Sequence, residues 1–328
     1  MIILVFLVIF KILFLTFPSV VLAAAREGLL LWLNNIVPAL LPFMIITNML
    51  VEMEFPRFLG ETLTPVMKKI FNLPGAGGFA LITGLTSGYP IGAKAVADLR
   101  KTGEISARDA QHLLAFCNNA GPLFILGVVG IGLFGNAAVG YVLWTGHVFS
   151  ALLLGILLKF LCRSDRPRLP VGYNFAEYAS GGRGRPPLHR ISSTLSSNSN
   201  VSPGKALSNA VKNAMESMAI IGGLVIFFNA TMAILGEIGL PDKGLLAGFI
   251  TGAVEVTGGV RKISECGIST TSLAFAAFAI AFGGLSIHMQ TFHFTESTGI
   301  KAAPYLFCKV LHGLLAATIT IFLARLFV

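Results

Sequence analysis

Charged residues are scarce in this sequence of 328 residues: Asp, Glu, Lys and Arg together make up 12% of it, whereas 55% is apolar. Soluble domains carry about 25% charged residues on average, so this chain has too few to cover a surface that faces water. The composition therefore predicts an integral membrane protein in contact with the lipid bilayer. The 36 glycines and 15 prolines favour broken helices over uninterrupted spans.

Motifs typical of enzymes and metal proteins are also missing. The sequence contains no Gly-Lys-Ser/Thr run of a phosphate-binding loop, no His-Glu-x-x-His and no Cys-x-x-Cys. We therefore expect no enzymatic activity, no cofactor and no metal. The net charge of +9 agrees with basic cytoplasmic loops, so nucleic acid is not expected as a partner. Four cysteines without paired spacing are interpreted as small apolar residues: Cys117, Cys162, Cys266 and Cys308.

Seven apolar stretches are long enough to cross a bilayer, which takes about 20 residues. They cover residues 2–24, 30–53, 111–134, 138–162, 213–236, 268–291 and 303–327. The first stretch ends in the small residues Ala23, Ala24 and Ala25, which leaves a cleaved signal peptide as an alternative. Its long apolar run and the lack of a preceding charge favour a transmembrane helix that is kept.

Two shorter apolar stretches, 73–93 and 243–260, are rich in glycine and broken near their middle. Such segments fit re-entrant helical hairpins better than full crossings. Irregular backbone at membrane depth is tolerated only where it is buried in protein or lines a wet cavity. These two hairpins therefore give the first indication of a functional site.

The only long hydrophilic stretch, residues 163–206, is basic and rich in serine, glycine and proline, as flexible linkers are. We interpret it as a cytoplasmic loop, which also places the N-terminus in the cytoplasm under the positive-inside rule. The predicted divisions are an N-terminal transmembrane helix (1–27), a first repeat (28–162), the linker (163–206) and a second repeat (207–328).

The parts on either side of the linker share a pattern. Ile82-Thr83-Gly84 in the first hairpin matches Ile250-Thr251-Gly252 in the second, and Ala115-Phe116 matches Ala277-Phe278. Each half then contains a span, a hairpin and two further spans, and three crossings per half give the halves opposite orientations. This arrangement predicts an inverted repeat like that of secondary transporters, with a site near the middle of the membrane.

Candidate substrate-binding residues of the first half lie at two interruptions. Asn118-Asn119-Ala120-Gly121-Pro122 breaks the span 111–134, because proline cannot continue the helix and buried amides need partners. Ser87-Gly88-Tyr89-Pro90 forms the turn of the first hairpin and brings two hydroxyls to a helix N-terminus, which suits an anion. The structural alternatives are interhelical hydrogen bonds for the asparagines and a simple turn for the hairpin.

The second half offers a matching set of candidates: Glu255, Thr257, Gly283, Gly284, Ser286 and His288. An ionisable residue at membrane depth is a functional candidate by default, so Glu255 is a candidate to hold a coupling proton or a cation such as Na⁺. Its alternative is a place at an exposed extracellular tip. Gly283 and Gly284 break the span 268–291, and His288 is either a titratable site residue or a histidine at a helix interface.

These runs resemble a known family. Thr83-Gly84-Leu85-Thr86-Ser87-Gly88-Tyr89-Pro90-Ile91-Gly92-Ala93-Lys94 is the most specific run, and the Asn118 and Gly283 breaks fit as well. They resemble sporulation integral membrane proteins of the nucleoside-recognition, or Gate, group. This group includes the spore maturation proteins and is similar to part of the concentrative nucleoside transporters. The resemblance covers most of 28–162 and patches of 207–328.

The resemblance implies an all-α polytopic membrane protein, which we expect to have about seven spans and two re-entrant hairpins. It also implies a transporter of endospore formation that moves dipicolinic acid across the outer forespore membrane. For this flat aromatic dianion we expect Ser87, Asn118 and Asn119 to contact the carboxylates and Tyr89 to stack on the ring. Two alternatives stay open: an ion-coupled carrier of nucleosides or other small anions, and a non-transporting scaffold of spore assembly.

Overall fold

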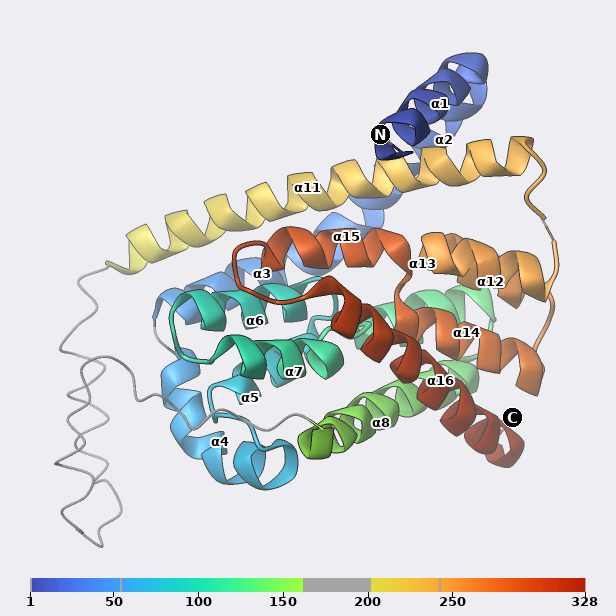
Figure 1. Ribbon diagram of the computed structural model, residues 1–328. Coiled ribbons are helices and arrows are strands. Elements are labelled where there is room, and N and C mark those ends of the chain that lie inside the picture. The colour runs from blue at the N-terminus through green and yellow to red at the C-terminus, as the bar shows by residue number, and fades with distance from the viewer. Residues whose placement is uncertain (1, 54, 162–201, 242, 328) are drawn as a thin grey trace, which may run out of the picture.

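The protein is built of helices (Figure 1). The computed structural model describes residues 2–53, 55–161, 202–241 and 243–327, and within these ranges it contains no strand. The first half comprises α1 (Ile2–Thr16), α2 (Pro18–Leu31), the π-helix η1 (Trp32–Ile36), α3 (Val37–Glu52), α4 (Phe55–Phe71), α5 (Gly77–Thr86), α6 (Ile91–Lys101), α7 (Ala107–Cys117), the π-helix η2 (Leu123–Leu133) and α8 (Ala137–Leu161). The second comprises α11 (Pro203–Glu237), α12 (Leu245–Val254), α13 (Val256–Ser264), α14 (Thr270–Phe282), α15 (Gly284–Thr295) and α16 (Ala302–Phe327). The expected all-α class is confirmed.

Four helical segments are long and apolar enough to cross a membrane: α8, α11, α14 together with α15, and α16. A fifth is obtained when the bent pair at the N-terminus counts as one span. The expected spans 30–53 and 111–134 are occupied by shorter helices. The figure of seven crossings therefore stays a prediction.

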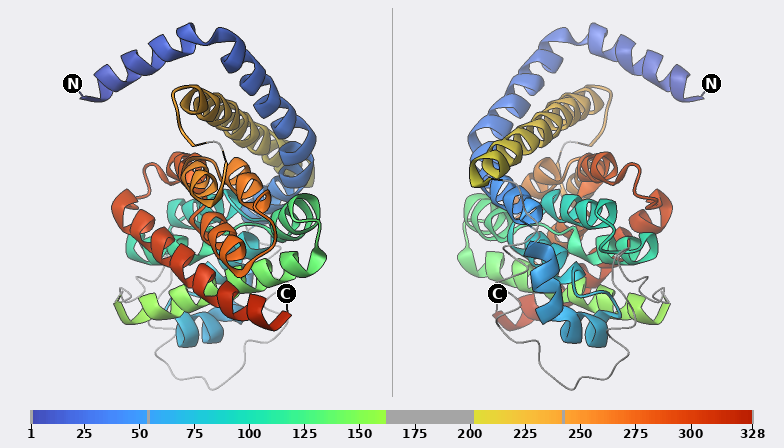
Figure 2. Two further views of the ribbon diagram at one scale, coloured as in Figure 1. Left: turned by 90° about the vertical axis from the view of Figure 1, so that its right-hand side faces the viewer. Right: turned by 90° about the vertical axis from the view of Figure 1, so that its left-hand side faces the viewer.

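The expected first span, 2–24, is not one straight helix. α1 ends at Thr16, α2 begins at Pro18, and the two helices are bent by 97°. Proline is tolerated at the start of a helix, but its ring and missing N–H interrupt the hydrogen-bond ladder from the helix before it. α2 then runs on to Leu31, so the boundary expected after residue 27 falls inside this helix. In Figure 2, α1 leaves the body of the molecule as an arm.

α11 is the longest helix, with 35 residues or about 52 Å, and it runs across α15 (Figure 1). Its start at Pro203 shows that the last residues of the expected linker are helical, whereas residues 162–201 lie outside the described ones. The indole of Trp32 donates a hydrogen bond to the carbonyl oxygen of Met218 at 3.0 Å. Gly222 faces the same indole, so that α11 and the N-terminal helices approach closely through a small residue.

Both expected hairpins are pairs of short helices. α5 and α6 are joined by Ser87–Pro90, and α12 and α13 by Glu255 alone. Glycines bring the helices of the second pair into backbone contact, because a Cβ on Gly259 would clash with Gly252. The helical hairpins are thus observed, and their re-entry into the membrane stays a prediction.

The order of elements is repeated in the two halves. A helix, a hairpin, a broken helix and a long helix follow one another twice: α3, α5–α6, α7–η2 and α8 in the first half, and α11, α12–α13, α14–α15 and α16 in the second. Among the described elements, α1, α2, η1 and α4 have no counterpart in this order. This order agrees with the repeat read from the sequence, while the opposite orientation of the halves and the likeness to a transporter core stay predictions.

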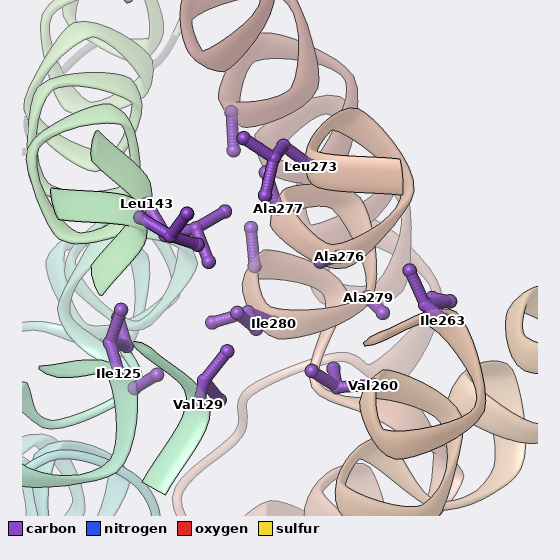
Figure 3. Packing of buried hydrophobic residues seen from close by; sticks show 14 of the residues in the cluster. Ile125, Val129, Leu143, Val260, Ile263, Leu273, Ala276, Ala277, Ala279 and Ile280 are labelled. Atoms are coloured by element: carbon purple, nitrogen blue, oxygen red, sulfur yellow. The ribbon is translucent and has the colours of Figure 1, made fainter. Parts of the chain in front are cut away.

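The largest apolar cluster joins the two halves. Figure 3 shows Ile125, Val129 and Leu143 of the first half facing residues of the second, namely Val260, Leu273, Ala276, Ala277 and Ile280. The run of buried alanines on α14 leaves little side chain between this helix and its neighbours. Small residues permit such close helix packing in membranes. The two halves of the molecule are therefore packed directly against each other through this cluster.

Candidate substrate site

The tip of the first hairpin rests on the break between α7 and η2. The backbone N–H of Tyr89 donates to the carbonyl oxygen of Asn119 at 2.5 Å. Gly88 has φ +84°, and a Cβ there would clash with the backbone nitrogen of Gly121. Only glycine adopts this conformation freely and leaves room for the neighbouring backbone. Ser87 and Pro90 flank the turn and are buried.

The tip of the second hairpin rests on the break between α14 and α15 in the same way. A Cβ on Gly284 would lie 2.8 Å from the carbonyl oxygen of Gly252 and 3.1 Å from that of Val254. Gly283 and Gly284 have φ +91° and +73°, so the break uses two consecutive left-handed residues. The four interruptions named from the sequence therefore form two pairs, each of one hairpin tip and one helix break.

Glu255 caps the helix that follows it. Its carboxylate accepts hydrogen bonds from the backbone N–H of Thr257 at 2.9 Å and of Gly258 at 2.6 Å. A carboxylate in this position also interacts favourably with the partial positive charge of the helix N-terminus. Tyr89 at the first tip packs against the apolar cluster that includes Val256, the neighbour of Glu255 at the second tip.

Asn118 and Asn119 are fully buried, and each uses its amide nitrogen for a protein contact. Asn118 Nδ2 donates to Thr291 Oγ1 and to Tyr305 OH, both at 2.8 Å. Asn119 Nδ2 donates to the carbonyl oxygen of Phe116 at 2.7 Å. The oxygen Oδ1 of both side chains is buried without a partner. Both asparagines thus combine the structural role considered above with a free acceptor.

His288 and Ser286 lie on the first turns of α15, and both are buried. The His288 ring makes edge contacts with Phe282, at 4.7 Å between centroids, and with Tyr305, at 5.5 Å. Neither ring nitrogen of His288 has a hydrogen-bond partner. Tyr305 thereby connects His288 of the second half to Asn118 of the first.

The expected spans also contain four buried polar residues that were not predicted as site residues: His147, Tyr305, Lys309 and His312. All are at most 2% exposed. Lys309 Nζ donates to the carbonyl oxygen of Asn118 at 2.9 Å and lies 3.1 Å from His312 Nδ1. His147 Nε2 accepts from the N–H of Ala120 at 3.0 Å. The sequence does contain a signal for this site: Lys309 lies within the apolar stretch 303–327. An ionisable residue inside a span is a functional candidate for the same reason as Glu255.

Lys309 is the buried lysine of this site. Among the described residues, no carboxylate forms an ion pair with it. An ammonium group has three N–H donors. Lys309 Nζ has two partners within hydrogen-bond distance, Asn118 O and His312 Nδ1. When Lys309 is protonated, one of its donors is therefore available to a ligand.

Several buried polar atoms of the two tips, the two breaks and α15 have no hydrogen-bond partner. The buried atoms without a partner include Tyr89 OH, Asn118 Oδ1, Asn119 Oδ1, Gln290 Oε1 and both ring nitrogens of His288. Buried polar groups are normally hydrogen-bonded, so such a group of unpaired atoms is the pattern expected of a ligand site. We call Tyr89, Asn118, Asn119, His288, Tyr305 and Lys309 the central cluster. Within the described part of the chain, no group of three or more His, Cys, Asp or Glu is placed to hold a metal.

Comparison with known proteins gives the family. Residues 33–157, which include the first hairpin and the first break, match the family model Gate, described as nucleoside recognition. The chain is 30% identical over 327 residues to the sporulation integral membrane protein YlbJ of Bacillus subtilis (strain 168), covering 93% of this chain and 78% of YlbJ. The chain belongs to this family of sporulation integral membrane proteins. No solved structure matches it.

Membership of the YlbJ family confirms the resemblance drawn from the Ser-Gly-Tyr-Pro and Asn-Asn-Ala-Gly-Pro runs. Both runs lie inside the Gate match. The family name and the apolar helices agree that this is an integral membrane protein. Tyr305, Lys309 and His312 lie outside the Gate match and complete the cluster from the second half.

Proposed function

We propose that the protein is a carrier that moves a small anion across a membrane during endospore formation. The single observation behind this proposal is the central cluster, where a buried lysine without a carboxylate partner stands beside unpaired polar atoms. Two broken helices and two hairpin tips surround it. Secondary transporters bind substrates at discontinuous helices of this kind.

The charge of Lys309 favours an anion over a neutral substrate. A buried charge without a counter-ion is costly, and a bound carboxylate would provide that counter-ion. Tyr89 OH and a ring N–H of His288 are further donors for an anion. The Oδ1 atoms of Asn118 and Asn119 only accept, so they suit water or a protonated group of the substrate.

We propose dipicolinic acid as the substrate and the outer forespore membrane as the place of action. Its two carboxylates would contact Lys309 and the hydroxyl of Tyr89, and its flat ring would stack against aromatic side chains of the cluster. The family of sporulation proteins supports the setting, and the buried cation supports the charge. The N-terminus and the basic segment 163–206 are proposed to face the cytoplasm.

A nucleoside is the second candidate. The free amide oxygens of Asn118 and Asn119 match the hydroxyl donors of a ribose, and the family model is described as nucleoside recognition. A nucleoside would leave Lys309 without a counter-ion, which is why we rank it second.

The test is uptake of radiolabelled dipicolinate into proteoliposomes that contain the purified protein. We expect saturable uptake that unlabelled dipicolinate inhibits and that uridine does not. Asn118→Ala should lower uptake strongly, because it removes contacts to Thr291 and Tyr305 and the free oxygen. The matched control is Asn229→Ala on α11, whose side chain bonds only within its own helix. Inhibition by uridine alone, or no saturable uptake by folded protein, would contradict the proposal.

A further inference from the structure

We infer that Lys309 and His312 form a binding site for one proton, and that this proton crosses the membrane together with the substrate anion. The inference rests on the proposed function and names the coupling ion of the same site. Its basis is the hydrogen-bond geometry around α16 and α8, which fixes where protons can sit.

The two histidines are held in defined protonation states by their partners. The N–H of Ala120 donates to His147 Nε2, so this nitrogen carries no hydrogen and His147 is neutral. His312 Nε2 faces the carbonyl oxygen of His147 at 3.3 Å, and a carbonyl only accepts, so Nε2 carries a hydrogen. His312 Nδ1 is then the atom left to face Lys309 Nζ at 3.1 Å.

Lys309 and His312 together can hold only one additional proton, which makes one of the two groups a cation. If the lysine is an ammonium group, His312 Nδ1 must accept from it; if Nδ1 is protonated, the lysine must be a neutral amine. Two protonated groups would place a donor against a donor and two like charges 3.1 Å apart inside the protein. The pair is therefore a one-proton site whichever residue holds the proton.

Whether the pair of Lys309 and His312 keeps this proton depends on whether the substrate anion is bound. With the anion bound, one of its carboxylates is the counter-ion of this positive charge, and the other is left to the neutral hydrogen-bond donors of the central cluster, such as Tyr89 OH. Without the anion, the pair would carry an uncompensated charge at membrane depth, which is strongly unfavourable. Unlike arginine, lysine can lose its proton in a buried site. The carrier is thus expected to return empty and neutral, so that anion and proton move in the same direction.

Among the described residues, no carboxylate is placed to act as the counter-ion of the protonated pair instead of the substrate. The titratable groups on the elements around the pair include these histidines, tyrosines, cysteines and carboxylates: His147 on α8, His288 on α15, Tyr305 and Cys308 on α16, Asp109, His112 and Cys117 on α7, and Tyr89 and Glu255 at the hairpin tips. α14 carries no titratable residue. The Glu255 carboxylate is engaged by two backbone N–H groups, and the described residues give Lys309 no carboxylate within ion-pair distance.

The first test uses the unaltered protein. Proteoliposomes contain a trapped pH-sensitive dye, the membrane potential is clamped to zero with valinomycin and K⁺, and radiolabelled dipicolinate is added outside. We expect the lumen to acidify in step with uptake, and a gradient of one pH unit, acid outside, to drive accumulation of about tenfold for each proton coupled. Uptake without acidification overturns the inference and leaves the proposed function standing. Absence of both uptake and acidification, with folded protein, removes both.

The second test separates the proton from the charge. Lys309→Arg keeps a positive charge that cannot be lost. We expect this variant to exchange labelled for unlabelled dipicolinate but to lose accumulation driven by the pH gradient. His312→Asn keeps an acceptor for Lys309 and removes a proton position, so the pH profile of accumulation should shift. The control is His112→Asn on α7, a buried histidine that contacts the carbonyl oxygen of Gly155 instead. Retention of pH-driven accumulation by folded Lys309→Arg overturns the inference.

Discussion

The backbone N–H of Tyr89 donates to the carbonyl oxygen of Asn119 at 2.5 Å, and this bond fastens the tip of the first hairpin to the break in the next helix. A carbonyl that a continuous helix would use internally is here free for a residue 30 positions away, because α7 ends at Cys117 and η2 begins only at Leu123. A backbone donor of one irregular segment is thus paired with a backbone acceptor of the other. The side chains of both residues then remain available to the central cluster.

Gly88→Ala should disturb this junction. Gly88 has φ +84°, and a Cβ there would clash with the backbone nitrogen of Gly121. Gly103 also has a positive φ, of +81°, but a Cβ there would meet nothing within 4 Å. We expect Gly103→Ala to cost about 1 kcal/mol of stability, the price of the left-handed backbone, and Gly88→Ala to cost clearly more and to lower uptake. The measurement is thermal unfolding of both purified variants; equal losses would show that the two backbones do not touch.

The local interruptions could be predicted from the sequence, but their pairing could not. Ser87–Pro90 and Asn118–Pro122 each carry turn or break signals within a few residues. That Tyr89 bonds to Asn119 depends on how α5, α6 and α7 pack, which no short-range pattern encodes. Lys309 was not predicted for a different reason: one charge in a long apolar run barely alters the mean hydropathy of that run, although an ionisable residue in a membrane span is a functional candidate.

The contact between α11 and the N-terminal helices offers a second matched pair of glycines. A Cβ on Gly222 would lie 2.7 Å from the Trp32 ring, whereas one on Gly223 would meet nothing within 4 Å. Gly222→Ala should therefore force the helices apart and destabilise the protein by about 1–3 kcal/mol. Gly223→Ala should be neutral or slightly stabilising, since alanine favours a helix by about 1 kcal/mol over glycine. Thermal unfolding in detergent checks both; a stable Gly222→Ala variant would mean that Trp32 does not pack as described.

Glu255 is expected to act as a helix cap. Glu255→Ala removes both acceptors of the Thr257 and Gly258 N–H groups and should cost about 1 kcal/mol. Glu255→Gln keeps one acceptor oxygen and should cost less. Uptake by each variant should follow its thermal stability. If Glu255 instead held the coupling ion, Glu255→Gln would lose uptake while its melting temperature stayed near that of the unaltered protein.

The segment 163–201 distinguishes a carrier from a scaffold. It joins α8 to α11 and carries a high density of arginine and serine. Replacing it with a Gly-Ser chain of equal length removes these charges but keeps its reach. Because the central cluster is built from helices outside this segment, we expect dipicolinate uptake in proteoliposomes to remain within about twofold of the unaltered level, a change of under 1 kcal/mol. Cells that carry the same replacement should form spores as the unaltered strain does. Intact uptake combined with failed sporulation would show that the segment docks a partner in addition to the transport activity.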